Sequence, residues 1–205
     1  MSDKGAETVG VRAGSVRRTT RETDIAVAWN LDGTGQGQIE TGVPFFDHML
    51  DQVARHGLND LTVKTVGDIA IDFHHTVEDT GIALGQALRQ ALGQARGIRR
   101  YGSAFIPFDE TLAFAAIDVS GRPFLVFDAE FPRQKVGEFD TELVEEFFRA
   151  LAFNAGITLH LKVHYGQNTH HMIEGLFKAF ARALYEATTV DPRVTGVPST
   201  KGALL

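Results

Sequence analysis

The pattern His-His-x-x-Glu occurs twice in the chain, as His170-His171-Met172-Ile173-Glu174 and earlier as His74-His75-Thr76-Val77-Glu78. Residues three and four apart share one face of a helix, so the Glu of each copy would lie beside both of its histidines. Adjacent histidines diverge by about 100° around the helix axis, and one helix does not readily direct both imidazole rings at one ion. We therefore predict two metal sites, each using one His and the Glu of one copy and the remaining His of the other.

The elements around the two copies follow a similar order. Alternating apolar residues predict strands at 25–31, 61–66, 110–117, 124–127 and 159–163, with a further strand beginning near 37–39. Helices are predicted at 45–56, at 141–155, and from each histidine pair to about residues 93 and 188. This period of nearly half the chain indicates a duplicated α+β unit.

Two β-sheets enclosing the helices would bury the apolar helix faces most simply, and would also bring the two histidine pairs together. The expected division of the chain is a flexible leader at 1–15, a first α+β repeat at 16–100, a second α+β repeat at 101–190 and a C-terminal tail at 191–205. The leader is assigned because its residues are small, charged and rich in glycine.

Composition excludes several classes of function. The chain has 205 residues, of which 43% are hydrophobic, and a net charge of -6, which disfavours a general nucleic-acid surface. It has no cysteine, so any metal would be held by nitrogen and oxygen ligands. The sequence shows no signal peptide and no apolar run of membrane-spanning length, and we expect a cytoplasmic protein without a membrane partner.

The eight histidines lie in four places, at residues 48 and 56, 74 and 75, 160 and 164, and 170 and 171. A single histidine is more often structural, and His56 and His164 are interpreted in this way. The repeated pairs favour instead the imidazole and carboxylate ligands of a transition metal. The alternative is that both patterns are merely polar helix starts with a solvated Glu.

Three segments of the chain resemble the signature segments of the imidazoleglycerol-phosphate dehydratase family. These segments are Phe46-Asp47-His48-Met49-Leu50, Asp72-Phe73-His74-His75-Thr76-Val77-Glu78-Asp79, and the run from His164-Tyr165-Gly166-Gln167-Asn168-Thr169 through the second pair to Phe180. The resemblance implies an enzyme of histidine biosynthesis that removes water from D-erythro-imidazole glycerol phosphate to give imidazole acetol phosphate. It also implies two ribosomal-S5-domain-2-like units, two Mn²⁺ ions per active site, and homo-oligomeric trimers assembled into a 24-mer.

The resemblance further implies the metal ligands, and it selects His160 over His164. One manganese would be held by His48, His75, Glu78 and His170, and the other by His74, His160, His171 and Glu174. The duplication is imperfect here, because His48 lies in a predicted helix and His160 in a predicted strand, which leaves the pairing of ligands open. Zinc, iron, cobalt or nickel would suit the same ligand types.

The reaction implied by the resemblance requires electrons from the imidazole ring, because the proton to be removed has no adjacent carbonyl group. Metal bound to the ring nitrogens would stabilise a negatively charged ring, so the ligands His48, His75, His171 and Glu174 are interpreted as catalytic. Glu22 is the candidate acid/base group; the alternative is a surface carboxylate at a strand end. Asp109 and Glu110, in the matching place, would orient metal-bound histidines or merely begin a strand.

The substrate phosphate requires fixed positive charge, which arginine supplies as a fork and lysine as a point charge. The candidates for substrate contact are Glu22, Gln52, Arg99, Arg122, Lys178, Ser199 and Lys201. Two rival functions remain open: a two-metal hydrolase, since paired metals commonly activate water, and an assembly module whose histidines join subunits through metal.

Overall fold

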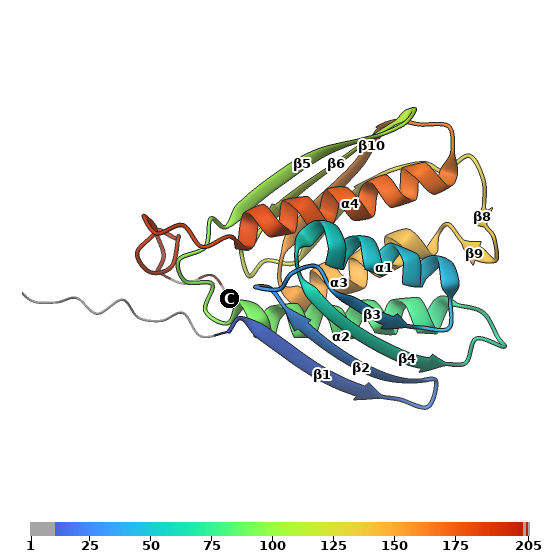
Figure 1. The fold of residues 1–205 in the computed structure, drawn as a ribbon, viewed down its shortest axis with the longest axis horizontal. Helices are drawn as coiled ribbons and strands as arrows, with labels where there is room; N and C mark the ends of the chain where they lie inside the picture. Colours follow the sequence, from blue (N-terminus) through green and yellow to red (C-terminus); the bar gives the residue numbers. More distant parts are fainter. Residues whose placement is uncertain (1–10, 203, 205) are drawn as a thin grey trace, which may run out of the picture.

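Two four-stranded sheets enclose a layer of four helices in the computed structural model, which describes residues 11–202 and 204 (Figure 1). The first sheet has the order β1-β2-β4-β3 and contains β1 (Ala13–Thr19), β2 (Thr23–Asn30), β3 (Gly37–Glu40) and β4 (Asp60–Gly67). The second has the order β5-β6-β10-β7 and contains β5 (Tyr101–Phe108), β6 (Thr111–Asp118), β7 (Phe124–Asp128) and β10 (Thr158–Tyr165). In each sheet the first three strands are antiparallel and the last is parallel to its neighbour.

The helices are α1 (Pro44–Gly57), α2 (His74–Leu92), α3 (Leu143–Ala155) and α4 (Thr169–Thr188). Helix α2 packs against α3, and α1 packs against α4. Buried aromatic side chains fill the middle of the helix layer, where the ring centroids of Phe148 and Phe177 lie 4.7 Å apart. The two sheets bury these apolar helix faces and remove them from water. The arrangement confirms the predicted α+β architecture, in which two sheets enclose the helices.

The two halves share unusually close helix-to-strand contacts that reveal the duplication. A Cβ atom at Gly14 in β1 would lie 2.0 Å from the carbonyl oxygen of Ala87 in α2. In the second half, a Cβ atom at Gly102 in β5 would lie 2.1 Å from the carbonyl oxygen of Ala183 in α4. Only glycine permits this approach, so both halves use the same packing device at the same place.

These contacts also correct the predicted leader. Residues 1–10 lie outside the described part of the chain, but Ala13 to Ser15 belong to β1 rather than to a leader. Gly14 is needed there for close packing against α2, although small residues in a sequence are typical of a loose segment. The strands β1 and β5 and the short hairpin of β8 (Lys135–Val136) and β9 (Phe139–Asp140) were not predicted.

Candidate active site

Both histidine pairs lie at the N-termini of long helices. His74 is the first residue of α2, and His170 is the second residue of α4. The two helices begin at the same end of the molecule, where the β8–β9 hairpin also lies (Figure 1). The asparagine before α4 caps the helix, since the Asn168 side chain accepts a hydrogen bond from the His170 backbone N–H at 3.0 Å.

Three potential ligands converge at the start of α4. Glu174 Oε2 lies 2.9 Å from His170 Nε2 and 3.2 Å from His48 Nε2, which α1 contributes. The carboxylate is buried, with 8% of the side chain exposed, and its other oxygen lies 2.7 Å from Lys178 Nζ. Burial acts to raise the pKa of Glu174, but the bonds from Lys178 and His170 outweigh it and lower that pKa. A buried carboxylate beside two imidazoles fits a divalent transition metal in its donor chemistry.

The second histidine of this pair is held by a carboxylate from the β5–β6 turn. His171 Nδ1 lies 2.8 Å from Glu110 Oε2, while Glu110 Oε1 accepts hydrogen bonds from the backbone N–H groups of Gln167 and Asn168. The bond from His171 and these two backbone bonds lower the pKa of Glu110 far below its ordinary range. A fixed acceptor at Nδ1 leaves Nε2 free for a metal. Glu110 therefore orients a histidine, as one of its two interpretations anticipated.

A cavity of about 480 Å³ opens beside this pair. Its walls include His170, His171 and Glu110, and two basic side chains join them, Arg133 from the loop before β8 and Lys135 from β8 itself. Neither basic residue was a candidate from sequence, because neither lies in a segment that carries the resemblance.

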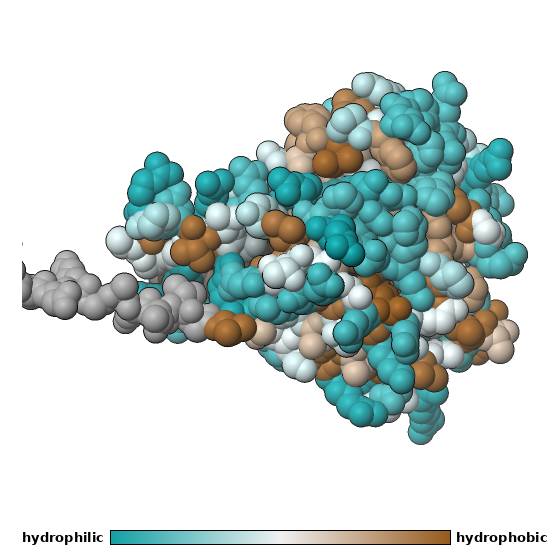
Figure 2. Space-filling model, viewed as in Figure 1, coloured by the Kyte–Doolittle hydropathy of each residue, from teal (hydrophilic) through white to brown (hydrophobic). Residues whose placement is uncertain are grey.

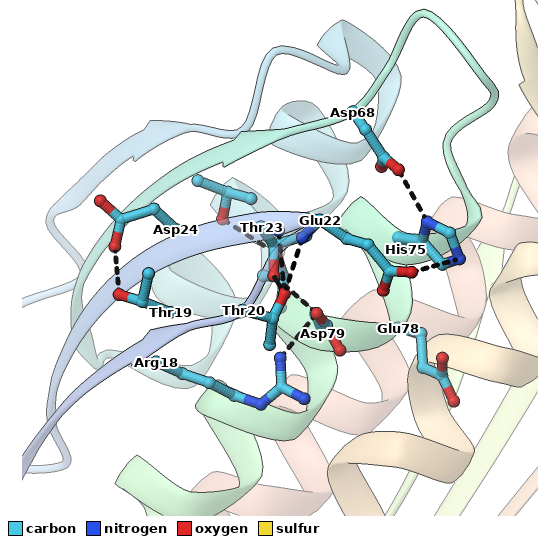
Figure 3. Close-up of polar contacts among 12 residues, drawn as sticks. Arg18, Thr19, Thr20, Glu22, Thr23, Asp24, Asp68, His75, Glu78 and Asp79 are labelled. Carbon is cyan, nitrogen blue, oxygen red and sulfur yellow. Dashed lines mark hydrogen bonds and ion pairs between the residues drawn. The ribbon is translucent and has the colours of Figure 1, made fainter.

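The first pair has a related but different arrangement (Figure 3). His75 Nδ1 lies 3.0 Å from Asp68 Oδ2, in the loop after β4, and His75 Nε2 lies 3.8 Å from Glu22 Oε1. The hydrogen bond with Asp68 and the charge of Glu22 raise the pKa of His75, against the opposing effect of desolvation. His74 Nε2 lies 3.7 Å from Glu78 Oε2 on the same helix face. Asp68 was missed because it stands outside the repeated pattern.

Among the described residues, the two histidine pairs do not contribute to a common group of ligands. Across residues 11–202, the only three potential ligands within 4.8 Å of one another are His48, His170 and Glu174. The predicted partition had placed Glu174 with the other metal, apart from His48 and His170. The predicted sharing of residues between the two pairs is therefore not seen among residues 11–202 of one chain.

His160 lies on a different face from the ligand cluster. Its neighbours Leu159 and Leu161 are buried against the helix layer, so the exposed His160 side chain points to the outer face of the second sheet. The sheet thus separates His160 from His171 of the same chain. On this outer face, the ring of His164 packs 5.5 Å from the ring of Phe105, which agrees with a structural role for His164.

The candidates for substrate contact divide between the two ends of the molecule. Gln52 and Lys178 lie at the ligand cluster, since Gln52 Nε2 is 3.4 Å from His48 Nδ1 and Lys178 bonds Glu174. Arg122 lies at the opposite end of the second sheet, where Arg122 Nη2 is 3.4 Å from Asp118 Oδ2.

Glu22 lies beside His75, and the other candidates, Arg99, Ser199 and Lys201, gather at this second end. Arg99 Nη1 lies 3.9 Å from Glu186 Oε1, near the end of α4. The tail that carries Ser199 and Lys201 docks at the same end, where Arg100 Nη1 donates a 3.0 Å hydrogen bond to the Pro198 carbonyl. Strand β6 joins the two ends, from Thr111 beside Glu110 to Asp118, a span of roughly 23 Å at about 3.3 Å per residue. The groups predicted to bind metal and phosphate are therefore well separated within one chain.

Comparisons with known proteins identify the family of the chain. A family model described as imidazoleglycerol-phosphate dehydratase matches residues 41–184. A protein of that name from Symbiobacterium thermophilum is 79% identical over 193 residues, covering 94% of this chain and 93% of the relative. One from Acetivibrio thermocellus is 64% identical over 189 residues, covering 92% and 97% of the two chains.

Two solved structures are similar over most of their length. The crystal structure of imidazoleglycerol-phosphate dehydratase from Staphylococcus aureus has a TM-score of 0.80 and 43% identity, and covers 87% of this chain and 99% of that chain. The enzyme from Pyrococcus furiosus, solved in complex with (S)-C348, has a TM-score of 0.79 and 36% identity, and covers 92% and 100%.

The duplicated α+β fold is thus that of a dehydratase, an enzyme class that cleaves carbon–oxygen bonds by removing water. Within that class, the chain belongs to the imidazoleglycerol-phosphate dehydratase family. Among the described residues, every helix is too short or too polar to cross a membrane.

Proposed function

We propose that the chain removes water from D-erythro-imidazole glycerol phosphate to give imidazole acetol phosphate in histidine biosynthesis, and that it does so with two Mn²⁺ ions per active site. The observation that carries this proposal is the convergence of His48, His170 and Glu174 at the start of α4. His171 and His75, each oriented by a carboxylate, would supply further nitrogen ligands through Nε2. A bound divalent metal would act as a Lewis acid that stabilises negative charge on the imidazole ring.

The side chains of the protein have separate tasks in this reaction. The Glu22 carboxylate accepts no hydrogen bond from the described residues and has 51% of its side chain exposed, so it is available to take the proton from the substrate carbon. Lys178 holds Glu174 in its ionised form, which favours metal binding over protonation. Arg99, Arg122, Ser199 and Lys201 would bind the phosphate group and orient the substrate.

We propose further that each complete active site forms between copies of the chain, in trimers that assemble into a 24-mer. The separation of roughly 23 Å along β6 supports this arrangement, because a small substrate does not span it. A neighbouring copy would bring its phosphate-binding end, and its exposed His160, to the ligand cluster of the first.

The direct test measures imidazole acetol phosphate released by the manganese-loaded assembly, with chelator-treated protein as the control. Product formation that disappears with the metal and returns with Mn²⁺ is expected. Absence of product from the fully loaded assembly would refute the proposal. Hydrolysis of phosphate esters or amides without dehydration would favour a hydrolase. Loss of assembly on chelation, from a protein that is inactive when loaded, would favour an assembly module.

A further inference from the structure

Glu22 and Glu110 occupy matching positions in the two halves, but only the Glu110 carboxylate is held by hydrogen bonds. Each residue stands directly before the threonine that opens the second strand of its sheet, Thr23 in β2 and Thr111 in β6. Glu110 accepts bonds from His171 and two backbone N–H groups, and Thr111 Oγ1 donates to it at 3.1 Å. At His75 the hydrogen-bond partner of Nδ1 is Asp68, which has the role that Glu110 has at His171. The carboxylate of Glu22 is therefore left free.

The backbone that carries Glu22 is nevertheless fixed to α2 by a polar network (Figure 3). Thr20 Oγ1 accepts hydrogen bonds from the N–H groups of Glu22 at 3.1 Å and Thr23 at 3.0 Å, which closes the turn between β1 and β2. Thr23 Oγ1 then donates to Asp79 Oδ2 at 2.6 Å. Arg18 Nη1 lies 2.6 Å from the same Oδ2 atom. The turn is thus connected to the helix that presents His75.

The second half lacks both charged members of this network. Gly175 follows Glu174 as Asp79 follows Glu78, and so occupies the matching position in α4. Ile106 pairs with Ala113 in the second sheet as Arg18 pairs with Ile25 in the first. The fold therefore accepts an apolar pair at this place, and the ion pair occurs only in the half whose glutamate is free.

The ion pair carries a desolvation cost, and the matching place in the second half has no such pair. Asp79 is 7% exposed and the Arg18 side chain 28% exposed, and removing such charges from water commonly costs more than their attraction returns. A contribution to stability therefore does not explain this ion pair well. A better explanation is that the pair fixes the position of a nearby group. An acid/base group must stay within hydrogen-bonding distance of the proton that it transfers.

We propose that Arg18 and Asp79 are positioning residues that hold the β1–β2 turn against α2 and thereby aim the Glu22 carboxylate at the substrate beside His75. This inference rests on the proposed function, because it assigns the network to proton transfer by Glu22. Arg18 and Asp79 act through Thr23 and the turn and do not touch the substrate.

The test replaces the pair by its counterparts from the second half, in the double variant Arg18→Ile and Asp79→Gly. The kcat of the manganese-loaded assembly should fall about 100-fold, the loss associated with a misplacement of about 1 Å, while KM, bound metal and assembly stay unchanged. In a Glu22→Gln background the same double substitution should have no further effect on kcat, because the group that it positions is already disabled. Arg17→Ile is the matched control, since Arg17 forms an exposed ion pair with Asp24 in the same hairpin and should leave kcat unchanged.

Hydrogen exchange of the metal-free protein gives a second readout. The amides of residues 20–23 should exchange faster in the double variant than in the wild type, and those of 108–111 should not change. An equal fold-loss of kcat in the wild-type and Glu22→Gln backgrounds, a loss of metal from the assembled variant, or unchanged exchange at 20–23 would each overturn the inference. If the double variant fails to assemble, the single variant Thr23→Val takes its place. This substitution removes the hydroxyl that bonds Asp79, and its effect on kcat is measured in the wild-type and Glu22→Gln backgrounds. A wild type without dehydratase activity would refute the proposed function, while the exchange result would still decide whether the pair holds the turn.

Discussion

His48 Nε2 lies 3.2 Å from Glu174 Oε2, although the two residues are 126 positions apart in the chain. Helix α1 contributes the imidazole from the first half, and α4 contributes the carboxylate from the second. The packing of α1 against α4 therefore builds the cluster, and neither half could form it alone.

His48→Gln should reduce the manganese bound to the purified protein, because it removes one of three converging ligands. Loss of affinity of at least about tenfold is expected, since even residues that merely support a ligand are worth that much. Metal analysis of dialysed protein measures the effect. His56→Gln, on the same helix, is the control and should keep its metal. Equal occupancy in both variants would remove His48 from the ligand set.

Glu22→Gln should leave bound manganese unchanged and lower kcat by about 10²–10⁴-fold, the range for loss of a positioned acid/base group. The substitution keeps the size of the side chain and removes only its ability to accept a proton. Steady-state kinetics and metal analysis on the same sample provide the measurement. Glu40→Gln, which changes an exposed carboxylate on β3, should be silent. Loss of metal in the Glu22 variant would show that this residue binds metal instead of transferring a proton.

Asp68→Asn and Glu110→Gln should each weaken manganese binding by about 10–100-fold, because each carboxylate fixes the Nδ1 side of one histidine. Titration calorimetry of metal-free protein checks the affinities. In a His75→Ala background, Asp68→Asn should not weaken manganese binding further, whereas Glu110→Gln should still weaken it by the same factor. Additive losses for Asp68 and His75 would contradict the assigned role of Asp68.

Chains disabled at opposite ends should complement each other. A Glu174→Ala chain and an Arg122→Ala chain should each be inactive alone, and should recover activity when dissociated and reassembled together, because some shared sites then receive both intact ends. A mixture of Glu174→Ala and Glu174→Gln chains is the control and should stay inactive. No recovery in verified mixed assemblies would place the whole active site within one chain.

Asp60 offers a test of acid stability away from the site. Its carboxylate accepts hydrogen bonds from the N–H groups of Thr34 at 2.8 Å and Gln36 at 3.0 Å, and these bonds lower the pKa of Asp60 from its ordinary 3.8. The resulting stability is fully present above pH 3.8 and is lost as the pH falls through the lowered pKa.

Asp60→Asn should therefore lower Tm near neutral pH by about 2–4 °C, corresponding to at most about 1 kcal/mol for a partly solvated bond. The gap should close as the pH falls well below 3.8, because the wild type then loses the same interaction. Thermal unfolding followed by circular dichroism across this range measures it. A gap that stays constant at low pH would show that the ionised carboxylate is not the cause.

The sequence predicted the central elements of the fold because their signals are local. Pro44 begins α1, alternating apolar residues mark β2 and β4, and the histidine pairs begin α2 and α4. Strands β1 and β5 were missed because Gly14 and Gly102 give no local sequence pattern. The need for glycine at these positions becomes evident only from the packed helices, where Ala87 and Ala183 leave no room for a Cβ atom. Long-range packing supplies the reason for those glycines.

The candidate site was predicted less completely for the same reason. The repeat identified His170 and Glu174, and the resemblance added His48, but only the tertiary fold places these three together. Asp68 has no sequence pattern of its own, and it becomes informative only when its oxygen is seen beside His75 Nδ1. The outer-face position of His160 likewise depends on which side of β10 meets the helices.

The separation of the two ends of β6 has a consequence for inheritance. In the proposed assembly each chain contributes its two ends to two different active sites, so a chain that assembles normally but lacks both functional ends also inactivates sites that it shares with intact partners. Co-expression of such a chain with the wild type would reduce activity below the fraction of intact chains. Combined changes at both ends would therefore behave as dominant defects, whereas a change at one end would lower activity only in proportion to the defective chains.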